Sequence, residues 1–263
     1  MYFYNAQNNS FWDKNVRSGS FDSRMFFWRY KLKHTLKLII ALFLSFVVTF
    51  TFSRTIGPID SALTSMPLYG LTFLLDAGHG GFDAGASGTR TDVPEAPLNL
   101  AITRFLKKEL EMRGATVVLT RCDNEALAST KKEDMDIRRQ IAHRVGYAAV
   151  LSIHMNKFTD YKPNGPTVFS DDTDADVALA KKIQSALDTA LARKAREAKV
   201  SDFFLFDCTD APCVLIECGF LSNADDERLL QQEPHQKAIA GAIADGIEAY
   251  FDAQKGVPVF IRS

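Results

Sequence analysis

The residues best able to do chemistry are two histidines and two glutamates, three of which stand at or near the ends of apolar runs. His79 follows LLDAG, His154 ends AVLSIH, and Glu217 lies near the end of CVLIEC. Glu95 lies between them in the sequence, in the segment VPEAP. Two imidazoles and a carboxylate form a donor set that suits catalytic zinc, which takes three protein ligands and keeps a fourth position for water. A further carboxylate beside such a site can accept a proton from water and pass it to a leaving amine.

Spacing alone does not show whether these residues form a catalytic zinc site or have no chemical role, because carboxylates without a chemical role are far more common. The glycines of the segment 78–88 allow the backbone to approach a metal or ligand closely. A phosphate-binding loop is disfavoured, since the segment contains neither G-K-[ST] nor a G-x-G-x-x-G that opens a helix. The cysteine spacing 208–213–218 does not match the C-x2-C of a thiolate zinc site, so we expect ordinary buried thiols.

From residue 71 onward, short β-branched runs alternate with segments of helical periodicity. This alternation predicts a single α/β domain whose mostly parallel central sheet is covered by helices on both faces. Ligands gather at the carboxyl ends of the strands in such sheets, so His79, His154 and Glu217 are expected to meet at one edge. The expected strands are 71–76, 116–120, 149–154, 167–170, 203–206 and 213–218, and the expected helices are 97–113, 135–146, 174–191 and 234–251.

The amino-terminal part of the chain has the pattern of a membrane anchor. Residues 1–37 carry seven Lys and Arg against two Asp, and 38–52 form an uncharged apolar run close to the minimum length for a spanning helix. The positive-inside rule then predicts a cytoplasmic tail at 1–37, a transmembrane signal anchor at 38–52 and a linker at 53–70. We therefore expect a single-pass protein of the cell membrane, with an extracytoplasmic catalytic domain at 71–263. A buried core helix and a cleaved signal peptide are the alternatives.

Five motifs in order resemble a known family, the zinc-dependent N-acetylmuramoyl-L-alanine amidases of the Amidase_3 type. They are DAGHGG (76–81), Glu95 before NL, LTR (119–121), SIHMN (152–156) and LIECGFLSN (215–223). The resemblance implies that His79, Glu95 and His154 bind Zn²⁺ and that Glu217 is the catalytic acid and base. It also implies a peptidoglycan substrate, cleaved at the amide between N-acetylmuramic acid and the L-alanine of the stem peptide.

Within this family the chain looks most like the CwlD-type amidases of endospore-forming bacteria. The features are the anchored form without a further domain, the MPLYG lead-in at 66–70 and the basic stretch 194–199. Sporulation, germination and a role in forming muramic-δ-lactam in the spore cortex are therefore expected, on the forespore or cortex side of the membrane. The sequence does not decide whether an activating protein partner is required, nor which protein it would be. The tail alone carries the basic excess, so no nucleic-acid partner is expected.

Two rival functions come from different classes. A zinc peptidase acting within the stem peptide would use the same donor set, but H-E-x-x-H and its inverse are absent. An inactive, anchored peptidoglycan-binding module would need none of the four residues.

Three further residues have open roles: Arg121 and Arg138 contact stem-peptide carboxylates or form ion pairs, and His143 is a packing or surface residue where the family usually has Asn. Ala77 stands where the family usually has Pro.

Overall fold

The computed structural model describes residues 28, 31–48, 50, 65–144 and 146–255 of the chain, which divides into two units, Met1–Ser61 and Ala62–Ser263. In the first unit, residues 31–48 are helical. The expected anchor at 38–52 falls partly outside the described residues, as do the tail and most of the linker. No helix in the described part of the chain is both long and apolar enough to cross a membrane. The anchor stays a prediction.

The second unit is built on one six-stranded sheet with the order β2-β1-β3-β6-β4-β5. The four strands from β2 to β6 are parallel, whereas β4 pairs with β6 in the antiparallel sense and β5 runs parallel to β4. The sheet is therefore mixed and mostly parallel. Its strands are β1 (Thr72–Ala77), β2 (Thr116–Leu119), β3 (Ala149–Asn156), β4 (Thr167–Ser170), β5 (Lys199–Val200) and β6 (Cys213–Phe220).

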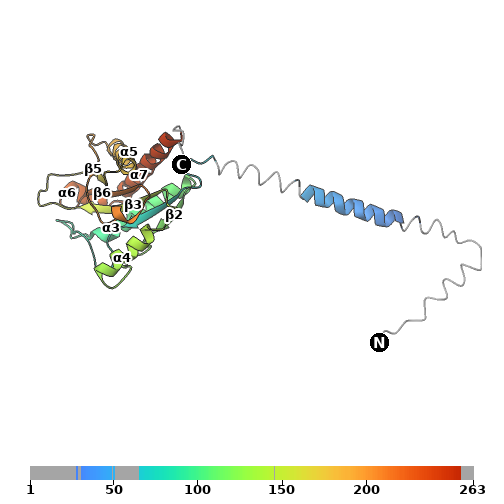
Figure 1. Ribbon diagram of the computed structural model, residues 1–263, viewed down its shortest axis with the longest axis horizontal. Helices are drawn as coiled ribbons and strands as arrows, with labels where there is room; N and C mark the ends of the chain where they lie inside the picture. Colours follow the sequence, from blue (N-terminus) through green and yellow to red (C-terminus); the bar gives the residue numbers. More distant parts are fainter. Residues whose placement is uncertain (1–27, 29–30, 49, 51–64, 145, 256–263) are drawn as a thin grey trace, which may run out of the picture. The chain divides into compact units, whose positions relative to one another are not determined.

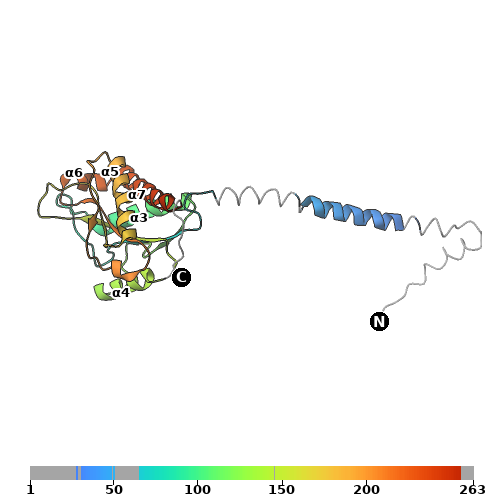
Figure 2. The same ribbon diagram turned by 45° about the horizontal axis from the view of Figure 1, so that its top comes forward.

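Helices cover both faces of this sheet, as predicted (Figures 1 and 2). Alternate strand residues point to opposite faces, so Leu75 joins the larger core under α3, α5 and α7, and Leu74 joins a smaller core. The smaller core also contains residues of α4 and of a 3₁₀ turn. The bounds are α3 (Glu95–Met112), α4 (Lys131–Ala142), α5 (Asp174–Ala190), the 3₁₀ turn (Phe206–Cys208) and α7 (Glu233–Gln254).

The structure differs from the predicted secondary structure in three regions. Residues 203–206 do not form a strand; their aromatic rings cover the sheet instead, with Phe203 packing edge-on against Phe169 at a centroid distance of 5.4 Å. The fifth strand is the short β5. Helix α4 begins four residues earlier than expected, because the Thr130 side chain accepts a hydrogen bond from the amide of Glu133 and caps it. A further helix, α6 (Ala224–Leu230), lacks apolar periodicity and was not expected.

All four cysteines are free thiols. Cys208, Cys213 and Cys218 are buried, as predicted, and burial holds the pKa of the Cys213 and Cys218 thiols well above the usual value. Cys122 is exposed, so the expectation of a buried thiol is wrong there. It follows β2 by only three residues and lies in the loop beyond that strand.

Candidate metal centre

His79, Glu95 and His154 come together although up to 75 residues separate them in the sequence. His79 lies just after β1, Glu95 is the first residue of α3, and His154 lies in β3. The Glu95 carboxylate bridges the two rings: Oε2 is 3.3 Å from His79 Nε2, and Oε1 is 3.0 Å from His154 Nδ1. One possible ligand atom from each residue lies within 4.8 Å of the other two. The convergence of these three residues is as predicted.

Backbone and side-chain donors fix the Glu95 carboxylate. Its Oε2 accepts a hydrogen bond from the amide of Ala86 at 2.8 Å, and Oε1 accepts from the amide of Met155 at 3.0 Å. The Asn99 side chain, one helical turn further along α3, donates to Oε1 at 3.1 Å. Burial alone would raise the pKa of Glu95, but the hydrogen bonds to His154 and His79 outweigh it and hold that pKa far below its usual range. The group is a carboxylate anion, ready to act as a ligand.

A second carboxylate orients His79 from the other side of its ring. Asp83 Oδ2 lies 3.0 Å from His79 Nδ1, and Lys131 Nζ lies 3.5 Å from the same Asp83 oxygen. Burial lowers the pKa of His79, but Glu95 and Asp83 raise it overall. A carboxylate on one ring nitrogen fixes the tautomer and presents the other nitrogen to a metal. Here that other nitrogen is Nε2, which faces Glu95.

Gly78 makes room for the second imidazole. A Cβ at this position would lie 2.1 Å from His154 Cε1, closer than any real contact. The peptide of Gly78 is also pinned to β3, because its amide donates to the carbonyl of Ile153 at 3.1 Å. A glycine is therefore required here by the close approach of His154.

Glu217 lies beside the three donors without joining their hydrogen bonds. It is the register partner of His154 on β6. The residue is partly exposed, yet its Oε2 is shielded from solvent and has no hydrogen-bond partner in the described part of the chain. Burial raises the pKa of Glu217 to about 7, with His154 opposing the shift and Glu95 adding to it. A carboxyl group with a pKa near neutrality can both accept and donate a proton.

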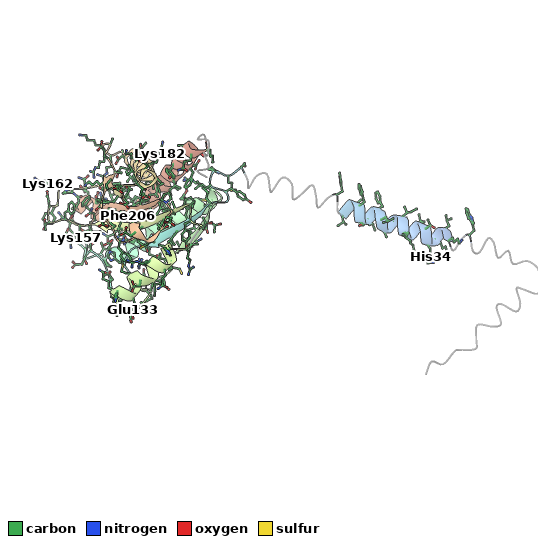
Figure 3. The ribbon with its side chains drawn as sticks, viewed as in Figure 1. His34, Glu133, Lys157, Lys162, Lys182 and Phe206 are labelled. Atoms are coloured by element: carbon green, nitrogen blue, oxygen red, sulfur yellow. The ribbon has the colours of Figure 1, made fainter. Side chains whose placement is uncertain are left out.

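A cavity of about 230 Å³ adjoins these groups. It lies at the carboxyl ends of the parallel strands; Lys157, the first residue after β3, marks that edge of the domain in Figure 3. Residues of the metal centre form part of its wall, and both charged and apolar side chains form the rest. The polar members include His79, His154 and Glu217 and also Asp76, Asp83, Lys131, Asp134, Arg138 and Ser152, and the apolar ones include Met135, Phe203 and Leu205.

The donor set fits a zinc ion. Two imidazole nitrogens and one carboxylate oxygen lie within 4.8 Å of one another. Their number and type are those of the protein ligands in a catalytic zinc site. Two of the ligand side chains also have outer partners that fix their direction, as metal ligands usually do: Asp83 for His79 and Asn99 for Glu95. Glu217 is not one of the three donors, and its buried Oε2 has no hydrogen-bond partner among the described residues, so it is available for proton transfer.

Residues 73–249 match the Amidase_3 family, described as N-acetylmuramoyl-L-alanine amidase. The chain belongs to this family. The CwlD amidase of Clostridioides difficile, solved in complex with the GerS lipoprotein, is 36% identical with a TM-score of 0.67 over 70% of this chain and 99% of that one. The catalytic domain of CwlV, an N-acetylmuramoyl-L-alanine amidase of Bacillus (Paenibacillus) polymyxa, is 31% identical with a TM-score of 0.63 over 69% and 98%.

Among curated proteins, the probable cell wall amidase LytH of Staphylococcus epidermidis is 32% identical over 197 residues, or 74% of this chain. The match spans 64% of the length of that LytH protein. The amidase family is thus shared over the domain that carries the metal centre. The four site residues named from the sequence all lie within the matched segment.

The remaining candidates lie outside the metal-ligand set. Arg138 forms buried ion pairs with Asp76 and Asp134, so the ion-pair interpretation is right for it. Arg121 is buried and, among the residues that the structure describes, donates to backbone carbonyls and forms no ion pair, so the ion-pair interpretation is wrong for it. His143 is exposed at the end of α4, as a surface residue. The supporting side chains of Asp83 and Asn99 were not predicted from the sequence. Each follows a ligand by four residues, and this spacing is the signal that could have indicated them.

Proposed function

We propose that this chain hydrolyses the amide bond between N-acetylmuramic acid and L-alanine in peptidoglycan, using Zn²⁺ held by His79, Glu95 and His154. The observation that carries the proposal is the buried carboxyl oxygen of Glu217, which has no hydrogen-bond partner in the part of the chain that the structure describes and lies beside a three-donor metal centre. Membership of the amidase family and the likeness to CwlD and CwlV support the same reaction.

Each part of the site has a distinct task in this reaction. When bound, Zn²⁺ supplies a Lewis acid that polarises an amide carbonyl and acidifies water at neutral pH. Glu217 accepts the proton of the attacking water and delivers it to the departing alanine nitrogen. Its raised pKa suits both steps, since the group must bind the proton and then release it. Asp83 and Asn99 keep the ligand side chains in place.

Digestion of purified peptidoglycan by the full-length chain tests the proposal. With zinc we expect intact muramic acid and new amino-terminal L-alanine, identified by mass, and with chelator we expect neither. New amino groups inside the stem peptide would instead show a zinc peptidase. Retention of the chain on peptidoglycan without any cleavage would show a binding module.

A role in the spore cortex is the finer part of the proposal. It is supported by the likeness to CwlD at 36% identity over nearly all of that chain. The CwlD structure contains a lipoprotein, GerS, so a lipoprotein partner is proposed for this chain too. Expression in a spore-former that lacks its own cortex amidase should restore muramic-δ-lactam to the spore peptidoglycan. Spores that stay free of the lactam while the chain cleaves peptidoglycan in vitro would contradict the cortex role and leave the amidase activity intact.

We also propose that residues 38–52 hold the protein in the cell membrane with the catalytic domain outside the cytoplasm. The support is the charge asymmetry around this apolar run. Cell fractionation should place the chain with the membrane even after washing with high salt, and protease added outside spheroplasts should digest the domain. Release of the chain by salt, or protection from the protease, would contradict this placement.

A further inference from the structure

Two buried arginines bind the backbone of the segment that carries His79. We call residues 77–79 the metal loop; all three of its carbonyl oxygens accept hydrogen bonds from guanidinium groups. Arg121 donates from Nε to the carbonyl of Ala77 at 2.8 Å and from Nη2 to that of Gly78 at 3.0 Å. Arg138 donates from Nη1 to the carbonyl of Ala77 at 2.9 Å and from Nη2 to that of His79 at 2.7 Å. Side chains therefore hold each peptide of the metal loop.

Arg121 is the unusual member of the pair. Arg138 has two aspartates as ion-pair partners, whereas Arg121 forms no ion pair with any residue that the structure describes. Two further donors of Arg121 reach the carbonyls of Asp123 and Ala96, at 2.7 and 2.8 Å, and the residue is only 2% exposed. Burial and the charge of Arg138 lower the pKa of Arg121 to about 10. A buried cation without a carboxylate partner is costly, so simple packing is a poor reason for its presence.

The Ala77 and Gly78 carbonyls that Arg121 binds belong to the two residues directly before His79. His79 has a φ of +62°, a region that residues other than glycine seldom adopt, and the preceding peptides must be held for this turn to persist. The Gly78 carbonyl accepts a second hydrogen bond from the Asn99 side chain at 3.1 Å, and the same nitrogen donates to Glu95. One carbonyl thus connects Arg121 to the segment of His79 and to the carboxylate of the second ligand.

We propose that Arg121 is a positioning residue of the metal centre. Its guanidinium holds the metal loop in the conformation that aims His79 at Glu95, so its removal weakens metal binding beyond any loss of stability. This inference rests on the proposed zinc site. A planar fork with five donors can serve four carbonyls at once, which the three rotatable donors of a lysine ammonium cannot do in the same geometry.

Three variants of the full-length chain separate positioning from stability. Arg121→Met keeps the apolar stem and removes the donors, and Arg121→Lys keeps the charge but loses the fork. Ile247→Ala is the control, because Ile247 is fully buried in α7 and its loss destabilises the fold without changing the metal loop. For each we would measure the zinc dissociation constant by chelator competition, the absorption spectrum of the Co²⁺ form, and the Tm of the metal-free protein.

We expect Arg121→Met to bind zinc about 10-fold to 100-fold more weakly than wild type, the usual effect of losing an outer support of a metal ligand. Its Co²⁺ bands should shift, and Arg121→Lys should fall between the two. Ile247→Ala should keep wild-type zinc affinity and an unchanged Co²⁺ spectrum despite a lower Tm.

The proposal is overturned if Arg121→Met binds zinc as tightly as Ile247→Ala. If Arg121→Met does not fold, Arg121→Lys decides: wild-type affinity and Co²⁺ spectrum overturn the proposal, and weaker binding with a shifted spectrum supports it. A wild-type chain that binds no zinc would instead count against the metal site itself, so the two failures are distinguishable.

Discussion

His154 and Glu217 are register partners on the neighbouring parallel strands β3 and β6. Side chains at paired positions of adjacent strands project from the same face of a sheet, so this register places a metal-ligand imidazole next to a carboxyl group. Glu95 approaches the same imidazole from α3 and binds it at 3.0 Å. The two glutamates are therefore distinct: Glu95 is hydrogen-bonded within the donor set, and Glu217 has a buried oxygen without a hydrogen-bond partner among the described residues.

Glu217→Gln should separate catalysis from metal binding. Because the amide cannot take up a proton as the carboxylate does, we expect peptidoglycan hydrolysis to fall by about 10²-fold to 10⁴-fold. Zinc content, measured by elemental analysis, should stay at the wild-type level. The exposed Glu197 offers a matched control, Glu197→Gln, which should cleave normally. Loss of zinc together with activity in Glu217→Gln would show that Glu217 is a ligand.

His154→Ala should lose stoichiometric zinc, since one of the three donors disappears and Glu95 loses a partner at 3.0 Å. The measurement is bound zinc per chain after gel filtration in metal-free buffer. His143→Ala is the matched control, because His143 is exposed at the end of α4 and lies outside the donor set. Equal zinc in both variants would remove His154 from the proposed ligands.

Gly78→Ala should damage the metal centre through a steric clash alone. The new methyl group would lie 2.1 Å from His154 Cε1, so the imidazole must move away from its place beside Glu95. We expect weaker zinc binding and a lower Tm. Gly241→Ala is the control: a Cβ there meets nothing within 4 Å, and alanine favours a helix over glycine by about 1 kcal/mol, so stability should be unchanged or higher. Zinc binding by Gly78→Ala at wild-type affinity would contradict the proposed packing.

Asp76 should make folding stability depend on pH in the acid range. Burial raises its pKa, but Arg138 and hydrogen bonds from Ser152 and Thr120 outweigh this and bring the pKa below the usual 3.8. The folded protein thus favours the anion. Its contribution to the free energy of unfolding is complete above the unfolded pKa and is lost as pH falls through the lower folded pKa.

Asp76→Asn tests this linkage by denaturant unfolding at neutral and acid pH. Removing one partner of a buried ion pair should cost about 3 kcal/mol at pH 7, following the general cost of such changes. The difference from wild type should shrink as pH falls below the unfolded pKa near 3.8, where the unfolded carboxyl takes up a proton. It should be smallest below the lower folded pKa, where the folded carboxyl is neutral as well. Asp202→Asn, at an exposed position, should follow wild type throughout. A difference that stays constant with pH would show that Asp76 acts through packing and not through its charge.

Local patterns in the sequence were enough to predict most of the strands and helices and the edge of the sheet where the site residues gather. Apolar periodicity is a local property, so it located β1, β3, α5 and α7 to within a few residues. Parallel strands end at a common edge, so the positions of His79 and His154 already implied that they meet. The pattern was wrong at 203–206, where aromatic residues with strand propensity serve as a cover for the sheet.

Which side chains face one another across long separations in the sequence depends on how the elements pack. Spacing could not tell that Glu95 bridges the two imidazoles while the Glu217 oxygen has no partner among the described residues, since the positions of the two glutamates in the sequence do not give the distances of their side chains to the rings. Nor could it tell that Arg121 turns inward to backbone carbonyls. These outcomes depend on strand register and on the packing of α3 against the sheet, which set distances between residues that no local pattern relates.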